Sequence, residues 1–290
     1  MNRIRKAVIP AAGMGTRFLP ATKAIPKEML PIVNKPSIQL IVEEAAAAGI
    51  EQVVIVTGRG KVEIVDHFDA HPALEDTLRR AGKEALRQDV IRPTQLAKVA
   101  TVRQQRPLGL GHAILCAREL IGDEPFVVFL PDDLVDAQVP CARQLMDVYE
   151  RTGKSVLALM NVSRSETSQY GIAAGTPVPG DPQLLSIEKL VEKPSAEEAP
   201  STLAVVGRYV LTPDVFDYLA KTVPGRGDEI QLTDALAAMI ADKGLYGWLF
   251  DGERFDAGDV GGYLLANLNW ARKTPRLWNL VQEYVQKHRT

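Results

Sequence analysis

Residues 8–31 read VIPAAGMGTRFLPATKAIPKEMLP, and this stretch decides the fold that we expect. A short apolar run leads into a turn of small residues at 11–15, which is followed by the cations Arg17, Lys23 and Lys27. Glycine lets backbone N–H groups approach phosphate oxygens closely, and fixed cations oppose the phosphate charge. An ordinary glycine turn beside a sheet would explain the glycines but not the cations. The stretch therefore predicts a nucleoside triphosphate site after the first strand.

Two other phosphate-binding patterns do not match this stretch. Gly13-Met14-Gly15 supplies two glycines of G-x-G-x-x-G, but the third position is Phe18, whose ring does not fit where helix and strand pack closely. Prolines at positions 20, 26 and 31 also prevent a helix from following the turn. No G-x-x-x-x-G-K-[ST] run occurs here. A dinucleotide-binding turn and a P-loop are therefore both excluded.

The composition is that of an ordinary globular enzyme. The chain has 290 residues, of which 46% are hydrophobic and 24% charged, and its net charge of −2 offers no basic field to nucleic acid. Two cysteines, Cys116 and Cys141, are too few for a disulfide framework or a thiolate cluster. The apolar run near the N-terminus is too short for a signal sequence, and no apolar window is long enough to span a bilayer. We expect a cytoplasmic protein that binds neither membrane nor nucleic acid.

Apolar runs alternate with helix-like segments along the first half of the chain. Unbroken runs such as 52–57 (QVVIVT) and 126–130 (FVVFL) predict buried strands, and the segments between them predict helices. The expected strands are Lys6–Ala11, Gln52–Thr57, Lys98–Arg103, Phe126–Leu130 and Ser155–Val162, and the expected helices are Ser37–Ala48 (Ser37 as N-cap, Gly49 as C-cap), Lys61–Phe68, Ala73–Arg87, Gly111–Leu120 and Cys141–Arg151. This alternation predicts a Rossmann-like α/β fold with a mixed, mostly parallel sheet flanked by helices.

From Tyr170 the pattern changes to shorter strands separated by Pro and Gly turns. The expected elements are the strands Gly171–Ala174, Leu185–Glu192, Ala204–Leu211 and Tyr246–Asp251 and the helices Val215–Lys221, Gln231–Asp242, Gly261–Arg272 and Thr274–Lys287. We interpret residues 1–290 as a single domain, with a nucleotide-binding half at about 1–154, a smaller β-rich half at about 155–260 and C-terminal helices at about 261–290. Trp270, Trp278 and Tyr284 would dock the C-terminal helix on its own core or on a second subunit, the core being the commoner outcome.

The stretch at 8–31 resembles the signature of the sugar-phosphate nucleotidylyltransferases, a G-x-G-T-R loop followed by a K-x-x-L-P or similar run. Its opening AAG and its run KAIPKEMLP look most like bacterial members that use UTP and glucose 1-phosphate, because members that transfer thymidylyl groups usually open with two glycines. Further matches extend over nearly the whole chain. The resemblance implies Arg17 on the leaving phosphates and Lys27 between the two reactants, and it implies that the loop binds the nucleotide through Ala11, Ala12, Gly13, Gly15 and Thr16.

Asp132 and Asp133 directly follow the expected strand 126–130. Ligands collect at the carboxyl ends of strands in open α/β sheets, and Mg²⁺ takes few protein carboxylates and leaves its other positions to water and phosphate. The residues alone fit a turn or a helix cap equally well. The resemblance to the family's L-P-D-D or L-G-D-N motif implies that Asp132 binds Mg²⁺ on the nucleotide. The run RFDAGD resembles the family's D-x-G motif, which makes Asp256 the second metal ligand and leaves Asp259 to cap the next helix.

The sequence Val191-Glu192-Lys193-Pro194 ends an expected strand. A Glu–Lys pair at a strand end is usually a solvated edge, although a carboxylate accepts well from sugar hydroxyls and a lysine suits a phosphate. The resemblance to the family's E-K-P motif implies that Glu192 binds the sugar hydroxyls and Lys193 the sugar phosphate. By resemblance to the Y-G motif, Gly171 would let the backbone approach the sugar, with Gly207 in a similar part nearby.

Recognition of the base is the least visible feature. Gln104 follows the strand at 98–103, and its amide both donates and accepts, which suits a pyrimidine edge. Gly109 matches the family position where the backbone meets the base. We interpret His112 as part of a helix start, because the sugar phosphate is already ionised at neutral pH and needs no general base. The run 228–234 (DEIQLTD) resembles a family motif and is expected to start a helix with Asp228 as cap.

Together these features predict in-line attack by glucose 1-phosphate on the α-phosphorus of UTP, with Mg²⁺ as cofactor and pyrophosphate as leaving group. Three alternatives remain: transfer of a thymidylyl or cytidylyl group, a catalytically silent paralogue that binds UDP-glucose, and a metal-dependent glycosyltransferase. The glycosyltransferase would not need the G-x-G-T-R loop, and a silent paralogue could lose cations or carboxylates that are all present here. The resemblance also favours a homodimer or homotetramer.

Overall fold

Within residues 3–288, which the computed structural model describes, nine strands form one mixed sheet in the order β5-β4-β1-β6-β11-β8-β12-β10-β9. These strands are β1 (Lys6–Ala11), β4 (Gln52–Thr57), β5 (Lys98–Arg103), β6 (Phe126–Phe129), β8 (Val156–Asn161), β9 (Gly171–Val178), β10 (Asp181–Glu192), β11 (Leu203–Leu211) and β12 (Tyr246–Leu249). The mixed α/β architecture expected from the sequence is confirmed.

The sheet has a parallel half and a largely antiparallel half. Strands β5, β4, β1 and β6 are parallel, and β1 and β4 pair residue for residue from Lys6↔Gln52 to Ala11↔Thr57. Strand β11 is antiparallel to β6 and β8, β12 is parallel to β8, and β10 is antiparallel to β12 and β9. Because β9 also pairs with β11, these five strands close into a ring. The β6–β11 pairing joins the two halves in one sheet.

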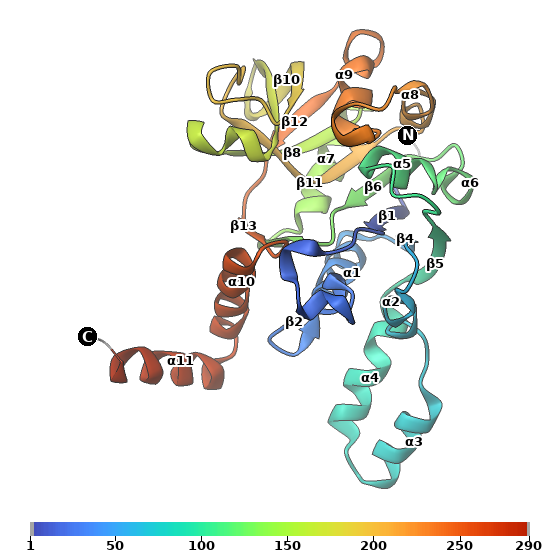
Figure 1. Ribbon diagram of the computed structural model, residues 1–290, viewed down its shortest axis with the longest axis vertical. Helices are drawn as coiled ribbons and strands as arrows, with labels where there is room; N and C mark the ends of the chain where they lie inside the picture. The colour runs from blue at the N-terminus through green and yellow to red at the C-terminus, as the bar shows by residue number, and fades with distance from the viewer. Residues whose placement is uncertain (1–2, 289–290) are drawn as a thin grey trace.

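Side chains of the central strands alternate between two apolar cores, one on each face of the sheet. Ile9 and Ile55 lie in one core and Val8 and Val54 in the other, all fully buried. Burial on both faces explains why β1 and β4 are unbroken apolar runs. The first core is covered by α1 (Ser37–Ala48) and α7 (Cys141–Thr152), and the second by α5 (Leu110–Leu115), α8 (Val215–Lys221) and α9 (Leu232–Lys243) (Figure 1).

Several helices project from this body (Figure 1). Helices α3 (Pro72–Arg80) and α4 (Glu84–Leu96) form a hairpin at one end of the molecule, next to α2 (Val62–Asp66). At the C-terminal side α10 (Val260–Arg272) leads to α11 (Pro275–Lys287), which lies apart from the sheet and buries none of its side chains. The expected docking of α11 on the core is therefore wrong, although Trp270 in α10 does contact Phe255 with ring centroids 5.8 Å apart. No described helix is long and apolar enough to cross a membrane.

Two of the expected helices are each divided in the structure. The helix expected at 73–87 is α3 and the beginning of α4, because the chain turns at Gly82, whose φ of 68° suits glycine. Helix α4 then continues to Leu96 with Pro93 inside it. The helix expected at 111–120 is α5 followed by α6 (Arg118–Ile121). Apolar periodicity continues through such short interruptions, so the sequence pattern did not locate them.

The expected helix caps are confirmed at two positions and wrong at two. Gly49 ends α1 with a φ of 97°, and the Asp259 carboxylate accepts the N–H groups of Gly261 (2.8 Å) and Gly262 (3.0 Å) at the start of α10. Ser37 is the first residue inside α1 and not its N-cap. Asp228 ends the turn η5 (Arg226–Asp228), whereas α9 begins only at Leu232.

Short elements carry the segments that the site uses. The stretch after β1 forms three 3₁₀ turns, η1 (Thr16–Phe18), η2 (Ala21–Lys23) and η3 (Lys27–Met29), and then the hairpin of β2 (Pro31–Ile32) and β3 (Lys35–Pro36). Another turn, η4 (Arg164–Gln169), precedes β9. Strand β7 (Asp133–Asp136) pairs antiparallel with β13 (Glu253–Asp256) in a separate ladder that the sequence analysis missed, and its register sets Asp256 opposite Asp133.

Candidate active site

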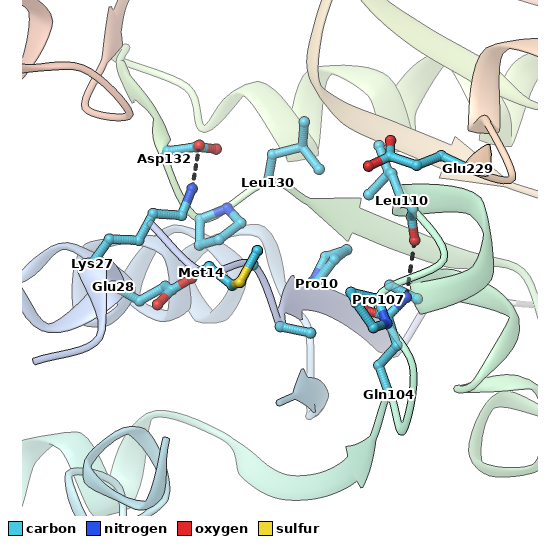
Figure 2. Close-up of a pocket in the computed structure, with 15 residues that line it drawn as sticks. Pro10, Met14, Lys27, Glu28, Gln104, Pro107, Leu110, Leu130, Asp132 and Glu229 are labelled. Carbon is cyan, nitrogen blue, oxygen red and sulfur yellow. Dashed lines mark hydrogen bonds and ion pairs between the residues drawn. The ribbon is translucent and has the colours of Figure 1, made fainter. Parts of the chain in front are cut away.

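A pocket lies at the carboxyl ends of β1 and β6, between the loop after β1 and the start of α5 (Figure 2). It is lined by Pro10, Ala12, Gly13, Met14, Lys27, Glu28, Gln104, Pro107, Gly109, Leu110, Ala113, Leu130, Pro131, Asp132 and Glu229. Six of these residues were predicted from the sequence as site residues: Ala12, Gly13, Lys27, Gln104, Gly109 and Asp132. The pocket thus combines residues from the beginning and the middle of the chain with Glu229 from its later part.

The loop after β1 is open at Gly13 and closely packed at Gly15. Ala11 ends β1 in the core, and no atom outside the loop lies within 4 Å of where a Gly13 side chain would start. Gly15 has a φ of 68°, and a Cβ there would lie 3.2 Å from the Lys27 Cβ. The Thr22 hydroxyl donates to the Gly15 carbonyl at 2.7 Å. Packing therefore fixes the loop against the segment that carries Lys27, while its pocket side stays accessible.

Lys27 and Asp132 form an ion pair inside the pocket, with Lys27 Nζ 2.6 Å from Asp132 Oδ2 (Figure 2). Burial disfavours the charged form of both groups, but the attraction between them raises the pKa of Lys27 and lowers the pKa of Asp132. Arg17 Nη2 lies 3.7 Å from the same carboxylate oxygen, and its side chain, like the neighbouring Thr16, is exposed. Two cations thus converge on one carboxylate at the pocket.

Asp256 lies near Asp132 although it is more than 120 positions later in the chain, because the pairing of β13 with β7 sets it opposite Asp133. The Ala257 N–H donates to the Asp132 carbonyl at 2.8 Å, which holds the two loops together. A Cβ on Gly258 would lie 2.8 Å from Asp132 Oδ2 and equally far from Asp256 Oδ1, so the two oxygens are no farther apart than twice that distance. The absence of a side chain at Gly258 leaves a cradle between the two predicted metal ligands.

This cradle fits a divalent metal that is shared with a nucleotide. Two carboxylates are the protein share that Mg²⁺ usually takes, the remaining positions going to water and phosphate. Within residues 3–288 no group of three or more His, Cys, Asp or Glu side chains could hold a metal by itself. The donor set therefore suits a metal that arrives with phosphate oxygens, not one resident in a protein cage.

Asp133 is a buried anchor beneath the two metal-ligand candidates. Its Oδ2 accepts the Gly207 N–H at 2.6 Å, and its Oδ1 accepts Arg254 Nε at 2.7 Å. Arg254 also donates to the Tyr170 hydroxyl at 2.9 Å and lies 3.4 Å from Asp256 Oδ2. Through Arg254 and the Gly207 N–H, Asp133 thus connects the β13 carboxylate of Asp256 with Tyr170 and Gly207.

Of the predicted sugar residues, Gly171 begins β9, Glu192 ends β10 with Lys193 directly after it, and Gly207 lies within β11. The Thr233 hydroxyl donates to Glu192 Oε2 at 2.6 Å, and a Cβ on Gly171 would lie 3.3 Å from the same oxygen. Lys193 follows with a φ of 45°, which is unusual for a residue with a side chain, and its Nζ is 3.7 Å from Glu192 Oε1. Gly207 packs against Asp133 and Leu130. A Cβ on Gly207 would lie 2.7 Å from the Leu130 Cβ. Its proximity to Asp133 accounts for the glycine there.

Gln104 is held in one orientation. Its Nε2 donates to the Gly109 carbonyl at 3.0 Å and lies 3.0 Å from His112 Nδ1, so this ring nitrogen acts as the acceptor. Burial lowers the pKa of His112, which favours the neutral ring that this arrangement needs. With both amide hydrogens engaged, the carbonyl oxygen of Gln104 is the atom available to the pocket.

The match to known proteins agrees with this geometry. Residues 6–273 match the family model described as nucleotidyl transferase. The chain belongs to the nucleotidyl transferase family. Enzymes of this family generally use a divalent metal ion, which agrees with the cradle at Gly258.

The similarity to individual nucleotidyl transferases covers nearly the whole chain. The UTP–glucose-1-phosphate uridylyltransferase of Staphylococcus haemolyticus is 48% identical over 287 residues, 99% of each chain. A uridylyltransferase of the same name from Staphylococcus saprophyticus is 50% identical over 98% of each chain. Among solved structures, UDP-glucose pyrophosphorylase complexed with UDP-glucose has a TM-score of 0.84 and 44% identity, covering 93% of this chain and 99% of that one. The UTP-bound enzyme of Acinetobacter baumannii has a TM-score of 0.89 and 38% identity, covering 98% and 99%.

Four residues at or beside this nucleotidyl transferase site were missed by the sequence analysis: Glu28, Lys61, Thr233 and Arg254. Glu28 lies inside the KAIPKEMLP run, Thr233 inside DEIQLTD, and Arg254 directly before the D-x-G motif, so the three motif matches contained the signal for them. Lys61 belongs to no such motif and is found only from its contact with Glu28.

Proposed function

We propose that this nucleotidyl transferase converts UTP and α-D-glucose 1-phosphate into UDP-glucose and pyrophosphate. The observation that carries the proposal is the Lys27–Asp132 pair, 2.6 Å apart in the pocket, together with Asp256, which lies on the other side of the Gly258 cradle from Asp132. The names of the relatives supply the choice of substrates, because four curated proteins at 48–50% identity are all called UTP–glucose-1-phosphate uridylyltransferase.

In the proposed mechanism a phosphate oxygen of glucose 1-phosphate attacks the α-phosphorus of UTP in line. The new P–O bond forms as the bond from the α-phosphorus to the β-phosphate oxygen breaks, and pyrophosphate leaves. The loop residues at 11–16 bind the triphosphate through backbone N–H groups, Arg17 holds the departing phosphates, and Lys27 bridges the two reactants. Positioning of the reactants and neutralisation of phosphate charge lower the reaction barrier, and no general base is needed because the attacking oxygen is already ionised.

Asp132 and Asp256 would hold Mg²⁺ together with the nucleotide phosphates. Bound there, the ion would neutralise phosphate charge that builds up as the bond to pyrophosphate breaks. Arg254 supports this arrangement from behind, because it fixes Asp256 while it is itself held by the buried Asp133.

The sugar and the base are proposed to lie on opposite sides of the reacting phosphates. Glu192 accepts from the glucose hydroxyls, Lys193 holds the sugar phosphate, and Gly171 and Gly207 let the sugar approach the backbone. On the other side the free carbonyl oxygen of Gln104 suits the N3–H of uracil, whereas N3 of cytosine is itself an acceptor.

Pyrophosphate release with glucose 1-phosphate, Mg²⁺ and each of UTP, dTTP, CTP, ATP and GTP in turn tests the proposal. Fast release with UTP that EDTA abolishes is the expected result. Release with dTTP alone would preserve the chemistry and overturn the substrate. No release with any nucleotide, from folded protein that still binds UDP-glucose, would identify a silent paralogue.

We also propose a homodimer or homotetramer in the cytoplasm, built as a single domain whose half at about 1–154 binds nucleotide and whose half at about 155–260 binds sugar. The C-terminal helices, expected at about 261–290, are α10 (Val260–Arg272) and α11 (Pro275–Lys287). They expose the apolar side chains Val260, Leu264, Leu265, Leu280, Tyr284 and Val285. Apolar surface of this kind is common at subunit interfaces. Sedimentation of the protein and of Leu280→Glu tests the assembly, and a monomer in the unaltered protein would overturn it.

A further inference from the structure

A second buried ion pair lies beside the Lys27–Asp132 pair. Lys61 Nζ is 2.9 Å and 2.8 Å from the two carboxylate oxygens of Glu28. The side chains are among the least exposed charged groups near the pocket, at 9% for Lys61 and 1% for Glu28. Glu28 lines the pocket next to Lys27 (Figure 2), and the phosphate-transfer roles proposed above use neither member of the pair.

Stability alone is a weak reason for a buried ion pair. The free energy lost by removing two charges from water offsets much of the free energy gained from their attraction. Proteins in which apolar residues of similar size replace such a pair are often equally stable or more stable. A pair that is retained at the wall of a reaction pocket therefore needs a second explanation.

The contacts of Glu28 supply that explanation. Glu28 follows Lys27 in the three-residue turn η3, so the position of its carboxylate limits the position of the Lys27 backbone. Its own carbonyl accepts the hydroxyl of Ser37 at the start of α1, at 3.1 Å. The turn is thus held at Glu28 from two sides, by α1 through the backbone and by Lys61 through the side chain.

Lys61 brings in a third part of the fold. It lies on the loop between β4 and α2, and this loop packs directly on the phosphate loop, since a Cβ on Gly58 would lie 3.0 Å from the Ala12 carbonyl oxygen. Burial lowers the pKa of Lys61, Glu28 opposes that effect, and the charge of Lys27 lowers it further. The two ammonium groups therefore influence each other electrostatically, and the Glu28 carboxylate attracts both of them.

We propose that Lys61 and Glu28 are positioning residues that hold Lys27 where it bridges the two reacting phosphates. Neither group touches substrate; Lys61 acts through Glu28, and Glu28 acts through the η3 turn on Lys27. The inference rests on the proposed function, because the role of Lys27 in phosphate transfer is what makes its position matter.

Lys61→Met tests this in a cycle with Lys27→Met. We expect Lys61→Met to lower kcat by at least about tenfold, since misplacing a reacting group by about 1 Å costs up to about a hundredfold. In protein that already carries Lys27→Met, adding Lys61→Met should lower kcat by less than about twofold, because the positioned group is gone. A further tenfold drop in the double variant would show an independent contribution and overturn the proposal.

Glu28→Gln/Lys61→Met separates positioning from folding. This double variant leaves no unpaired buried charge, so its thermal midpoint should return toward that of the unaltered protein while kcat stays low. Recovery of normal turnover together with normal stability would assign the pair to stability alone and overturn the proposal. This variant also carries the test if Lys61→Met does not fold.

Lys35→Met is the matched control. Lys35 likewise pairs with a glutamate, Glu43, at 2.8 Å, but both lie outside the pocket lining, so turnover should be unchanged. The activity of the unaltered protein separates a failure of the proposed function from a failure of the positioning role. If it releases no pyrophosphate from UTP and glucose 1-phosphate, the proposed function fails; if it does and Lys61→Met turns over normally, only the positioning role fails.

Discussion

Lys27 Nζ lies 2.6 Å from Asp132 Oδ2, so the cation proposed for phosphate and the carboxylate proposed for metal neutralise each other before substrates bind. A metal ion on Asp132 and a phosphate on Lys27 each replace one half of this pair. Neither replacement is complete without the other, because each alone leaves a partly buried charge without its partner. Metal and nucleotide should therefore bind with positive coupling.

Metal affinity without nucleotide measures this competition. Lys27→Met should bind Mn²⁺ about tenfold more tightly than the unaltered protein, because a hydrogen bond between charged groups contributes about 1.5–3 kcal/mol. Electron paramagnetic resonance of free Mn²⁺ gives the affinity, and Lys35→Met serves as control. Equal affinity in Lys27→Met and the unaltered protein would mean that Lys27 does not compete for Asp132.

Turnover measures the same pair in the reaction. Lys27→Ala and Asp132→Asn should each lose at least about a hundredfold in kcat, the usual effect of deleting one electrostatic contact to the transition state. Circular dichroism at matched concentration checks that both variants are folded. Near-normal turnover in either variant would remove that residue from the mechanism.

The cradle at Gly258 can be closed with one methyl group. A Cβ there would lie 2.7 Å from Arg17 Nη2 and 2.8 Å from each of the two carboxylate oxygens. Gly258→Ala should therefore lower kcat and the affinity for Mn²⁺ by at least about tenfold, as expected for a displaced reacting group. The thermal midpoint should change little, because Gly258 does not have a positive φ.

Gly261→Ala is the control for this substitution, since the nearest atom to its Cβ would be Asp259 Oδ1 at 3.3 Å, and Asp259 lies outside the proposed metal site. Alanine is also the better helix former, so Gly261→Ala should keep its stability and turnover. Equal activity of the two alanine variants would rule out the cradle as the metal position.

Glu192, which we propose as a sugar ligand, accepts a 2.6 Å hydrogen bond from the Thr233 hydroxyl. Thr233→Val has nearly the same shape without the hydroxyl, and it should raise the KM for glucose 1-phosphate about tenfold, the effect of losing one hydrogen bond to a charged group. The KM for UTP should stay the same. Thr233→Ser, which keeps the hydroxyl, should restore the KM for sugar; failure to do so would assign Thr233 to packing.

The parallel half of the sheet could be predicted from the sequence because burial on both faces demands unbroken apolar runs, and QVVIVT and FVVFL are such runs. The positions of the loop after β1 and of Asp132 could be predicted because the loop directly follows β1 and Asp132 follows the FVVFL run. The local sequence pattern was sufficient to predict these strands and the positions of the residues that follow them.

The β7–β13 ladder could not be predicted in the same way. Both strands have four residues, and DLVD and ERFD mix apolar with charged side chains because part of each strand faces the site. Their pairing is decided by Asp133, which accepts from Arg254 far along the chain. The pairs Lys61–Glu28 and Thr233–Glu192 were missed for the same reason: each joins segments whose contact exists only in the folded chain.

The β7–β13 ladder also joins two strands that the ribosome synthesises at different times. Arg254 follows Asp133 by 121 positions, so a ribosome that adds about 5–20 residues per second makes β7 roughly 6–24 s before the strand that pairs with it. During that interval the emerging chain already carries its phosphate loop and Asp132 but has no Asp256. A message cut short before β13 would therefore yield a polypeptide that lacks Asp256, the second carboxylate proposed for the metal.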